Sequence, residues 1–185
     1  MSAAAIDDHI SRYIRRIQLG LRFLGHGARA HTTCAWTGLT PDQLVTVRRR
    51  SRFNSNNRRR GPSPSSYSIF FRSNRSSSQA ALFISICRVV GLMRPTISIE
   101  NGERLCEAYE IYREWEPTSD LEFEQAVLLL EGTVHGASVE VRPCSSCAGS
   151  LLIDKFGDTQ NSCHLCRRNQ RETKGSPRES RAYSS

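Results

Sequence analysis

The sequence predicts a mainly α-helical protein with an N-terminal helix-turn-helix-like region, central helices and a C-terminal four-cysteine zinc ribbon. Three observations predict this fold. Apolar residues recur every three or four positions, residues 40–43 have the pattern of a helix N-terminus with a capping box, and two Cys-x-x-Cys pairs lie near the C-terminus. The 185 residues are about one domain, since domains usually hold ~100–200 residues. Because the 38% hydrophobic fraction is below the usual ~45–50%, we expect a modest core.

Residues 1–60 are predicted to be a helical, DNA-binding region. A first helix begins near Ile10, because its apolar residues share one face: Ile10, Tyr13, Ile14, Ile17, Leu21 and Leu24. A short helix at 28–35 and a tight turn at Gly38 follow.

The next helix has the clearest start in the sequence. Thr40 offers an N-cap hydroxyl, Pro41 suits the first helical position, and Gln43 completes a capping box. We expect Leu44 and Val47 to be buried. Two short helices around a glycine turn, the second ending in arginines, are typical of a helix-turn-helix, whose second helix enters the major groove.

Residues 61–80 are predicted to be a Ser/Arg-rich, mostly extended or mobile linker, with the apolar run 69–71 as an anchor to the core. Residues 81–137 are predicted to be helical at 81–90, where a buried strand is the alternative, at 105–115 and at 121–132. The middle helix carries an apolar stripe of Leu105, Tyr109, Tyr112 and Trp115 opposite the glutamates Glu103, Glu107, Glu110 and Glu114. We expect partner binding through Tyr109, Tyr112, Glu110 and Glu114.

The strongest chemical signal is Cys144-Ser-Ser-Cys147, followed after fifteen residues by Cys163-His-Leu-Cys166. Two such pairs can surround one tetrahedral Zn²⁺, which predicts a zinc ribbon at 138–170 with a short strand at 151–156. Four thiolates leave no open coordination position, so we expect one structural zinc and no catalysis. His164 as a substitute ligand and redox switching by the thiolates are the alternatives. Residues 171–185 are predicted to be a disordered basic tail.

Charge is strongly segregated along the chain. The net charge is +8, and all but two of the 26 basic residues are arginines; residues 43–99 hold eleven arginines and no acid, while 100–131 hold ten acids and two arginines. Because arginine binds phosphate through two hydrogen bonds, the acid-free segment predicts DNA binding. The predicted contacts are Arg48, Arg49, Arg50, Arg52, Arg58, Arg59 and Arg60. The alternatives are a solvated arginine face or a tether for RNA.

Other classes of protein fit less well. The sequence has no GxSxG, HExxH or phosphate-cradling glycine loop, and therefore predicts no enzyme. It has no secretory signal pattern and no apolar run long enough to cross a membrane. An odd number of cysteines, four of them in metal-like pairs, indicates a reducing compartment. We therefore expect a cytoplasmic protein with no membrane contact.

The chain resembles the FlhC family of flagellar transcriptional activators over residues 10–168. The resemblance is carried by Ile17-Gln18-Leu19 leading to Leu24, Gly27-Ala28-Arg29, Arg59 to Pro64, Ala108 to Tyr112, and the CSSCAG and CHLC pairs. It implies promoter binding as a hetero-oligomer with FlhD, a small helical protein, recruitment of RNA polymerase, and zinc at the four cysteines. The chain departs from the family between Ser65 and Gln79, where the family is more apolar.

Overall fold

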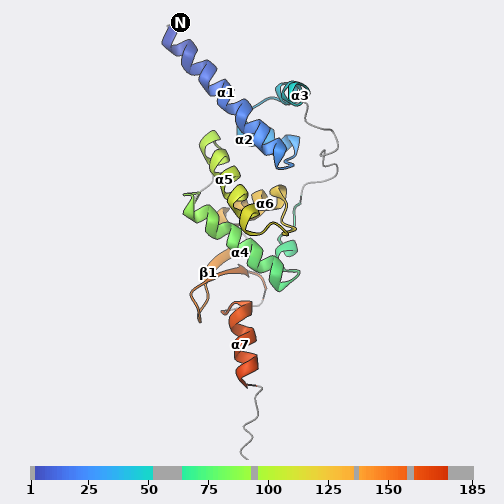
Figure 1. Ribbon diagram of the computed structural model, residues 1–185, viewed down its shortest axis with the longest axis vertical. Helices are drawn as coiled ribbons and strands as arrows, with labels where there is room; N and C mark the ends of the chain where they lie inside the picture. The colour runs from blue at the N-terminus through green and yellow to red at the C-terminus, as the bar shows by residue number, and fades with distance from the viewer. Residues whose placement is uncertain (1–2, 52–63, 93–95, 136–137, 158–160, 175–185) are drawn as a thin grey trace, which may run out of the picture.

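The computed structural model describes residues 3–51, 64–92, 96–135, 138–157 and 161–174. Within these ranges the protein is mainly helical, with a small two-stranded sheet. The elements are α1 (Ala3–Gly25), α2 (Ala30–Thr37), α3 (Pro41–Arg50), η2 (Tyr67–Phe71, a 3₁₀ helix), α4 (Asn74–Val89), α5 (Ile99–Trp115), α6 (Phe123–His135), β1 (Val139–Pro143), β2 (Ser150–Asp154) and α7 (His164–Lys174). The molecule is elongated, with the start of α1 at one end and α7 at the other (Figure 1). None of the helices in the described ranges is long and apolar enough to span a membrane.

The first three helices form a small unit of their own. Leu24, Leu39 and Leu44 make a buried cluster between α1, the α2–α3 turn and α3. Gly38 ends α2 in the left-handed conformation (φ 68°), which glycine adopts without a Cβ clash. The capping box is confirmed: the Thr40 hydroxyl accepts from the Gln43 backbone N–H at 3.2 Å, and the Gln43 side chain accepts from the Thr40 N–H at 2.9 Å.

The main core lies lower in the molecule, where α4, α5 and α6 meet the second half of α1. Phe23 of α1 contacts Phe123 of α6 edge-on, with ring centroids 5.0 Å apart. Tyr109 meets the same Phe123 ring edge-on at 5.0 Å, which joins α5 to this aromatic contact. Edge-to-face pairs of this kind stabilise a core beyond the area they bury. Helices α1 and α2 therefore share one core with α4, α5 and α6, which together with the hairpin we call the body.

The linker expected at 61–80 is wrong from residue 67 onwards. Residues Tyr67–Phe71 form η2, in which Phe70 is buried, as expected of an anchor. Helix α4 begins at Asn74, because the Ser73 hydroxyl accepts the Ser76 backbone N–H at 3.0 Å and so caps the helix. Serine is a strong N-cap, and the Ser-rich composition marks a helix start here. Residues 61–63 lie outside the described residues.

The C-terminal hairpin shares the core of the body. Strand β1 pairs antiparallel with β2, Val139 opposite Asp154 and Pro143 opposite Ser150, which confirms a strand close to the expected 151–156. The hairpin packs on α4 and α6, and Val139 and Leu152 belong to the main buried cluster. The expected division between residues 81–137 and 138–170 therefore crosses one continuous core.

The expected disordered tail begins later than predicted. Helix α7 extends to Lys174, so residues 171–174 are helical. Residues 175–185 lie outside the described residues.

Candidate functional site

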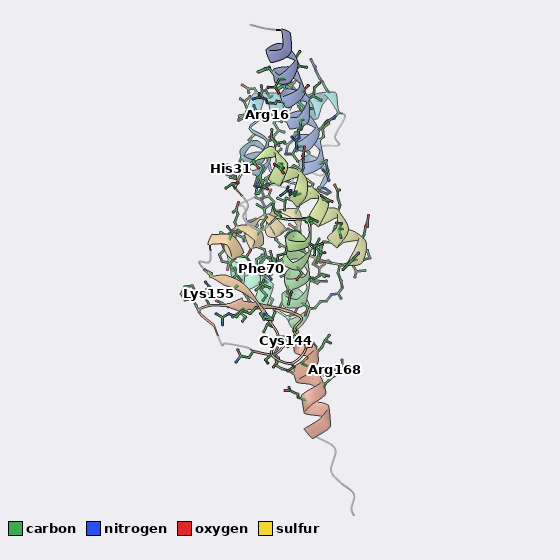
Figure 2. All side chains as sticks on the ribbon, turned by 90° about the vertical axis from the view of Figure 1, so that its left-hand side faces the viewer. Arg16, His31, Phe70, Cys144, Lys155 and Arg168 are labelled. Atoms are coloured by element: carbon green, nitrogen blue, oxygen red, sulfur yellow. The ribbon has the colours of Figure 1, made fainter. Side chains whose placement is uncertain are left out.

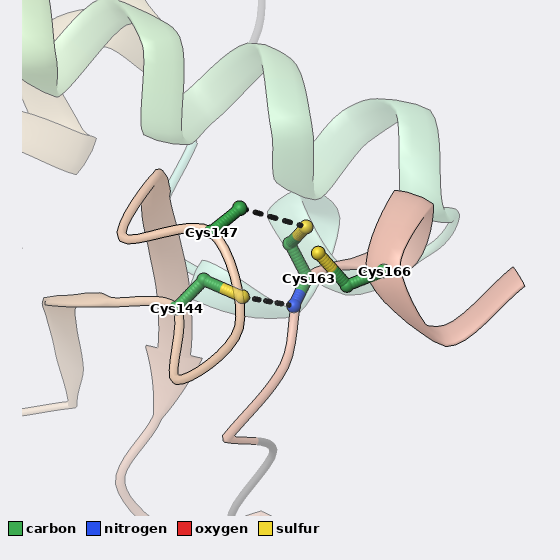
Figure 3. Close-up of side chains that lie close together, drawn as sticks. All are labelled: Cys144, Cys147, Cys163 and Cys166. Carbon is green, nitrogen blue, oxygen red and sulfur yellow. Dashed lines mark hydrogen bonds between the residues drawn. The ribbon is translucent and has the colours of Figure 1, made fainter. Parts of the chain in front are cut away.

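The four cysteines of the two pairs lie together beside the hairpin, and their side chains converge (Figure 3). Their Sγ atoms are all within 4.8 Å of one another, and those of Cys147 and Cys163 are 3.7 Å apart. Tetrahedral zinc, with Zn–S bonds of ~2.3 Å, places its sulfurs ~3.8 Å apart, whereas a disulfide needs ~2.05 Å. The group has the spacing of metal ligands and could hold a metal ion.

The local structure explains how the sequence builds this cluster. The first pair forms the turn between β1 and β2, where Cys144 N–H donates to the Gly149 carbonyl at 2.8 Å and Ala148 N–H donates to the Cys144 carbonyl at 2.9 Å. Ala148 takes a left-handed φ of 58° to close this turn. The second pair lies at the start of α7. The hairpin turn and the start of α7 thus each contribute two sulfur atoms to the cysteine cluster.

Hydrogen bonds shift the pKa values of two of the thiols, Cys144 and Cys166, in opposite directions. Cys144 Sγ accepts backbone N–H groups from Cys163 at 3.2 Å and from Ser146 at 3.4 Å, and these bonds lower the pKa of Cys144 to about 6. Bonds to the sulfurs of Cys163 and Cys147 raise the pKa of Cys166 to about 12. Four crowded thiolates repel one another, and a bound cation offsets that repulsion. The donor set therefore fits a thiophilic divalent metal.

His164 lies beside this cluster without joining it. The group of possible ligands in the described part of the chain consists of the four cysteines. His164 instead lines a cavity of about 460 Å³ between the start of α4 and the hairpin, together with Arg72 and Arg167. The alternative of a histidine ligand therefore has no support from the geometry.

Helix α3 presents a mixed polar and apolar face to solvent. Asp42, Val45, Thr46 and Arg49 recur at helical spacing on this outer face, and Val45 is 42% exposed. Leu44 and Val47 point inward, as predicted. We call these four residues the outer face of α3.

The predicted arginine cluster divides into parts with different surroundings. Arg49 and Arg50 are exposed at the end of α3, and within the described residues no hydrogen bond or ion pair holds either side chain. Arg48 is half-buried and lies near Cys34. The four remaining predicted contacts lie outside the described residues: Arg52, Arg58, Arg59 and Arg60.

Arg16 is a basic residue near this surface that sequence reasoning missed. It is exposed on α1, and its guanidinium carbon lies 3.7 Å from the position that a Cβ on Gly38 would occupy. It therefore lies beside the α2–α3 turn, far from Cys144 along the molecule (Figure 2). Helical periodicity places Arg16 off the apolar stripe, but only the packing of α1 against the turn brings it to this surface.

Three of the four expected partner-binding residues already have partners within the protein. The assignment of both tyrosines to a partner surface is wrong, because their side chains are buried. Tyr109 and Tyr112 are 7% and 0% exposed, and the Tyr109 hydroxyl donates to the Leu121 carbonyl at 3.0 Å. Glu110 accepts from Arg22 at 2.7 Å and lies 2.9 Å from a ring nitrogen of His26. Glu114 is exposed.

Comparison of the sequence with protein-family models and with curated proteins gives no match. The resemblance to the FlhC family therefore stays a prediction based on the segments named above. Function is inferred below from the cysteine cluster, the outer face of α3 and the charge distribution.

Proposed function

We propose that the protein is a DNA-binding transcriptional activator in which α2, the Gly38 turn and α3 act as a helix-turn-helix. The outer face of α3 carries this proposal. It combines Arg49, which suits guanine or phosphate, with Val45, which suits a thymine methyl group, on a helix fixed by its buried Leu44. Arg16 beside the turn is placed to contact a backbone phosphate.

We propose that the four cysteines hold one structural zinc ion. Cys144, Cys147, Cys163 and Cys166 would bind it as thiolates, and their spacing fits tetrahedral zinc. Bound zinc would join the hairpin turn to the start of α7. A complete set of four protein ligands leaves no position for a substrate, so we propose no enzymatic activity.

The resemblance to FlhC carries the biological part of the proposal. It leads us to propose that the protein activates flagellar, and hence motility, genes in the cytoplasm, together with a small helical FlhD-like partner and RNA polymerase. The surface for such a partner is not the buried stripe of α5. Glu114 and Trp115, which is 66% exposed at the end of the same helix, are the part of α5 that a partner can reach.

DNA binding is tested with the zinc-loaded full chain and random-sequence duplexes, from which bound sequences are selected and then compared with upstream regions of flagellar genes. On a selected duplex, Arg49→Ala should weaken binding by roughly 5- to 150-fold, the effect of ~1–3 kcal/mol for one base contact. Chelation of the metal before the gel shift tests whether zinc supports binding.

Arg72→Ala is the matched control, because Arg72 is also an exposed arginine of the acid-free segment but lies between η2 and α4. It should leave duplex affinity nearly unchanged. Equal losses for Arg49→Ala and Arg72→Ala would mean that charge alone binds the duplex and would refute the role given to α3.

One observation favours an RNA-binding or protein-interaction module as the second candidate. Phe156 is 83% exposed next to β2, and Leu165 is 65% exposed within the second cysteine pair. Exposed aromatic rings of this kind stack on single-stranded bases. Single-stranded RNA that displaces every selected duplex, with Phe156→Ala reducing RNA binding, would support this candidate over the first.

A further inference from the structure

The two cysteine pairs are joined by hydrogen bonds that need no metal. The Ser145 N–H donates to the Asn161 carbonyl at 2.8 Å, and the Cys163 N–H donates to Cys144 Sγ at 3.2 Å (Figure 3). Both bonds cross from the hairpin turn to the segment that enters α7. They align the backbone of the first pair with the backbone at the start of the second pair.

Three serine hydroxyls lie at the same crossing. Ser162 Oγ is 3.1 Å from Ser145 Oγ and 3.5 Å from Ser146 Oγ. Because a hydroxyl both donates and accepts, Ser162 can bond to the two serines of the first pair at once. We call Ser145, Ser146 and Ser162, with the two backbone bonds, the serine clasp.

Burial of apolar side chains does not fix the second pair on the hairpin. No side chain within residues 161–170 is buried, and Leu165 is 65% exposed. The last residue of the main buried cluster in chain order is Leu152. Hydrophobic burial therefore contributes little to the position of the second pair, which leaves polar contacts and the proposed zinc to hold it.

We propose that Ser162 is a positioning residue that, through the serine clasp, holds the four sulfurs together before a metal binds. This inference rests on the zinc site proposed above. In many small zinc domains the chain is unfolded until the metal binds. Here the clasp aligns the two pairs, so zinc enters a site that is already formed and leaves it without unfolding of the hairpin.

The clasp lies close enough to the sulfurs to set their spacing. Cys163 follows Ser162 directly, and its Sγ is 3.7 Å from Cys147 Sγ, close to the ~3.8 Å between two sulfurs on tetrahedral zinc. A movement of Ser162 away from the first pair would carry Cys163 with it. Cys166 lies in the first turn of α7, so both sulfurs of the second pair depend on this alignment.

Zinc affinity of the reduced full chain, measured by competition with a chelator of known affinity, tests the role of Ser162. Ser162→Ala should weaken zinc binding by roughly three- to tenfold, because an open arrangement of the two pairs then competes with the closed one. Ser162→Thr keeps the hydroxyl and should bind zinc like the wild type. Ser150→Ala is the matched control and should also match the wild type, because this serine of the same hairpin contacts Ser85 of α4.

A double-mutant cycle tests whether the hydroxyls act together. Ser145→Ala should weaken zinc binding by no more than Ser162→Ala, which breaks both hydroxyl contacts. The variant with both substitutions should then bind zinc like Ser162→Ala alone. Losses that multiply in the double variant would contradict the clasp.

Amide hydrogen exchange of the metal-free, reduced full chain tests whether the site forms without metal. The Ser145 N–H should exchange at least roughly tenfold more slowly than an unbonded amide, since its bond to Asn161 must open first. Ser162→Ala should remove most of this protection. The same variant should keep the helix content of the wild type in far-UV circular dichroism, because Ser162 lies outside the helices.

Two results would overturn the proposal: unchanged zinc affinity of Ser162→Ala, and a Ser145 N–H that exchanges as fast as an unbonded amide in the metal-free wild type. The absorption spectrum of the Co²⁺-loaded protein separates this proposal from the zinc site itself. A four-thiolate spectrum in both the wild type and Ser162→Ala would leave the zinc site standing even if the clasp fails. Absence of that spectrum in the wild type would refute the zinc site and the clasp with it.

Discussion

Replacement of Glu124 by alanine should destabilise the protein more than any other single change of a charged side chain described above. Glu124 lies on α6 and is 5% exposed. Its two oxygens accept from the Arg29 backbone N–H at 2.7 Å and from the Thr32 hydroxyl at 2.9 Å. Arg29 is the N-cap of α2 and makes no capping bond with its own side chain. A carboxylate from α6 therefore holds the start of α2.

The magnitude follows from these two bonds. Each hydrogen bond to a charged group contributes about 1.5–3 kcal/mol, and truncation to alanine also leaves a cavity and a partly buried N–H without its acceptor. We expect Glu124→Ala to lower the free energy of unfolding by about 3–5 kcal/mol. Glu124→Gln should cost only about 1 kcal/mol, because the amide oxygen can accept from Arg29 and the amide nitrogen can donate to Thr32.

Urea unfolding of the zinc-loaded protein, followed by far-UV circular dichroism, measures both values. In a chain of this size, 3 kcal/mol corresponds to a fall in Tm of roughly 6–12 °C. Glu114→Ala is the control, because this glutamate is exposed on α5, and it should stay within about 0.5 kcal/mol of the wild type. A loss below 1 kcal/mol for Glu124→Ala, or equal losses for alanine and glutamine, would refute the role of Glu124 at α2.

Three further changes test other contacts. Cys147→Ser should reduce bound metal from one ion per chain, measured by mass spectrometry, whereas Cys34→Ser, outside the cluster, should retain it. Gly132→Ala should destabilise by about 2 kcal/mol or more in urea unfolding, because its Cβ would overlap the ring of Tyr67 and lie 2.9 Å from Val139 Cγ2; Tyr67→Ala in the same chain should relieve the larger of the two overlaps and recover only part of the loss. Hydrogen bonds from Arg15 lower the pKa of Glu103 in the folded protein. The ion pair therefore contributes its full stabilisation of the fold above the unfolded pKa of ~4.3, and this contribution is lost as the pH falls through the lower folded pKa. Glu103→Gln should therefore cost less than about 1 kcal/mol at pH 7, since the pair is partly exposed, and should match the wild type in acid; a constant difference down to pH 2 would contradict this.

Features encoded within a few neighbouring residues were predictable from the sequence. The Thr40 cap and the buried Leu44 and Val47 depend on short spacings and on hydrogen bonds within one turn, and the spacing within each Cys-x-x-Cys pair predicts the cluster of four cysteines. The serines before residue 79 show where composition misleads. Composition alone predicts a linker there, but Ser73 at an N-cap position begins a helix.

Features that depend on distant residues could not be predicted. The spacing of Tyr109 and Tyr112 placed both on one helix face, but what covers that face comes from elsewhere in the chain. Phe83 contacts both tyrosine rings edge-on, and Phe123 contacts Tyr109. In a single sequence, an apolar stripe that binds a partner has the same helical spacing as one that packs into the core. Only the long-range packing of the chain determines which of the two it is.

The acidic segment also acquires a different role once its partners are known. Glu103 binds Arg15 through two hydrogen bonds, Glu110 binds Arg22, and Glu124 holds the start of α2. These acids anchor α1 and α2 to the body. These acids bind the first two helices, and within the described residues no ion pair holds Arg49 or Arg50 at the end of α3. The acidic segment thus holds α1 and α2 on the body, while Arg49 and Arg50 stay exposed at the end of α3, where they would favour the polyanion binding proposed above.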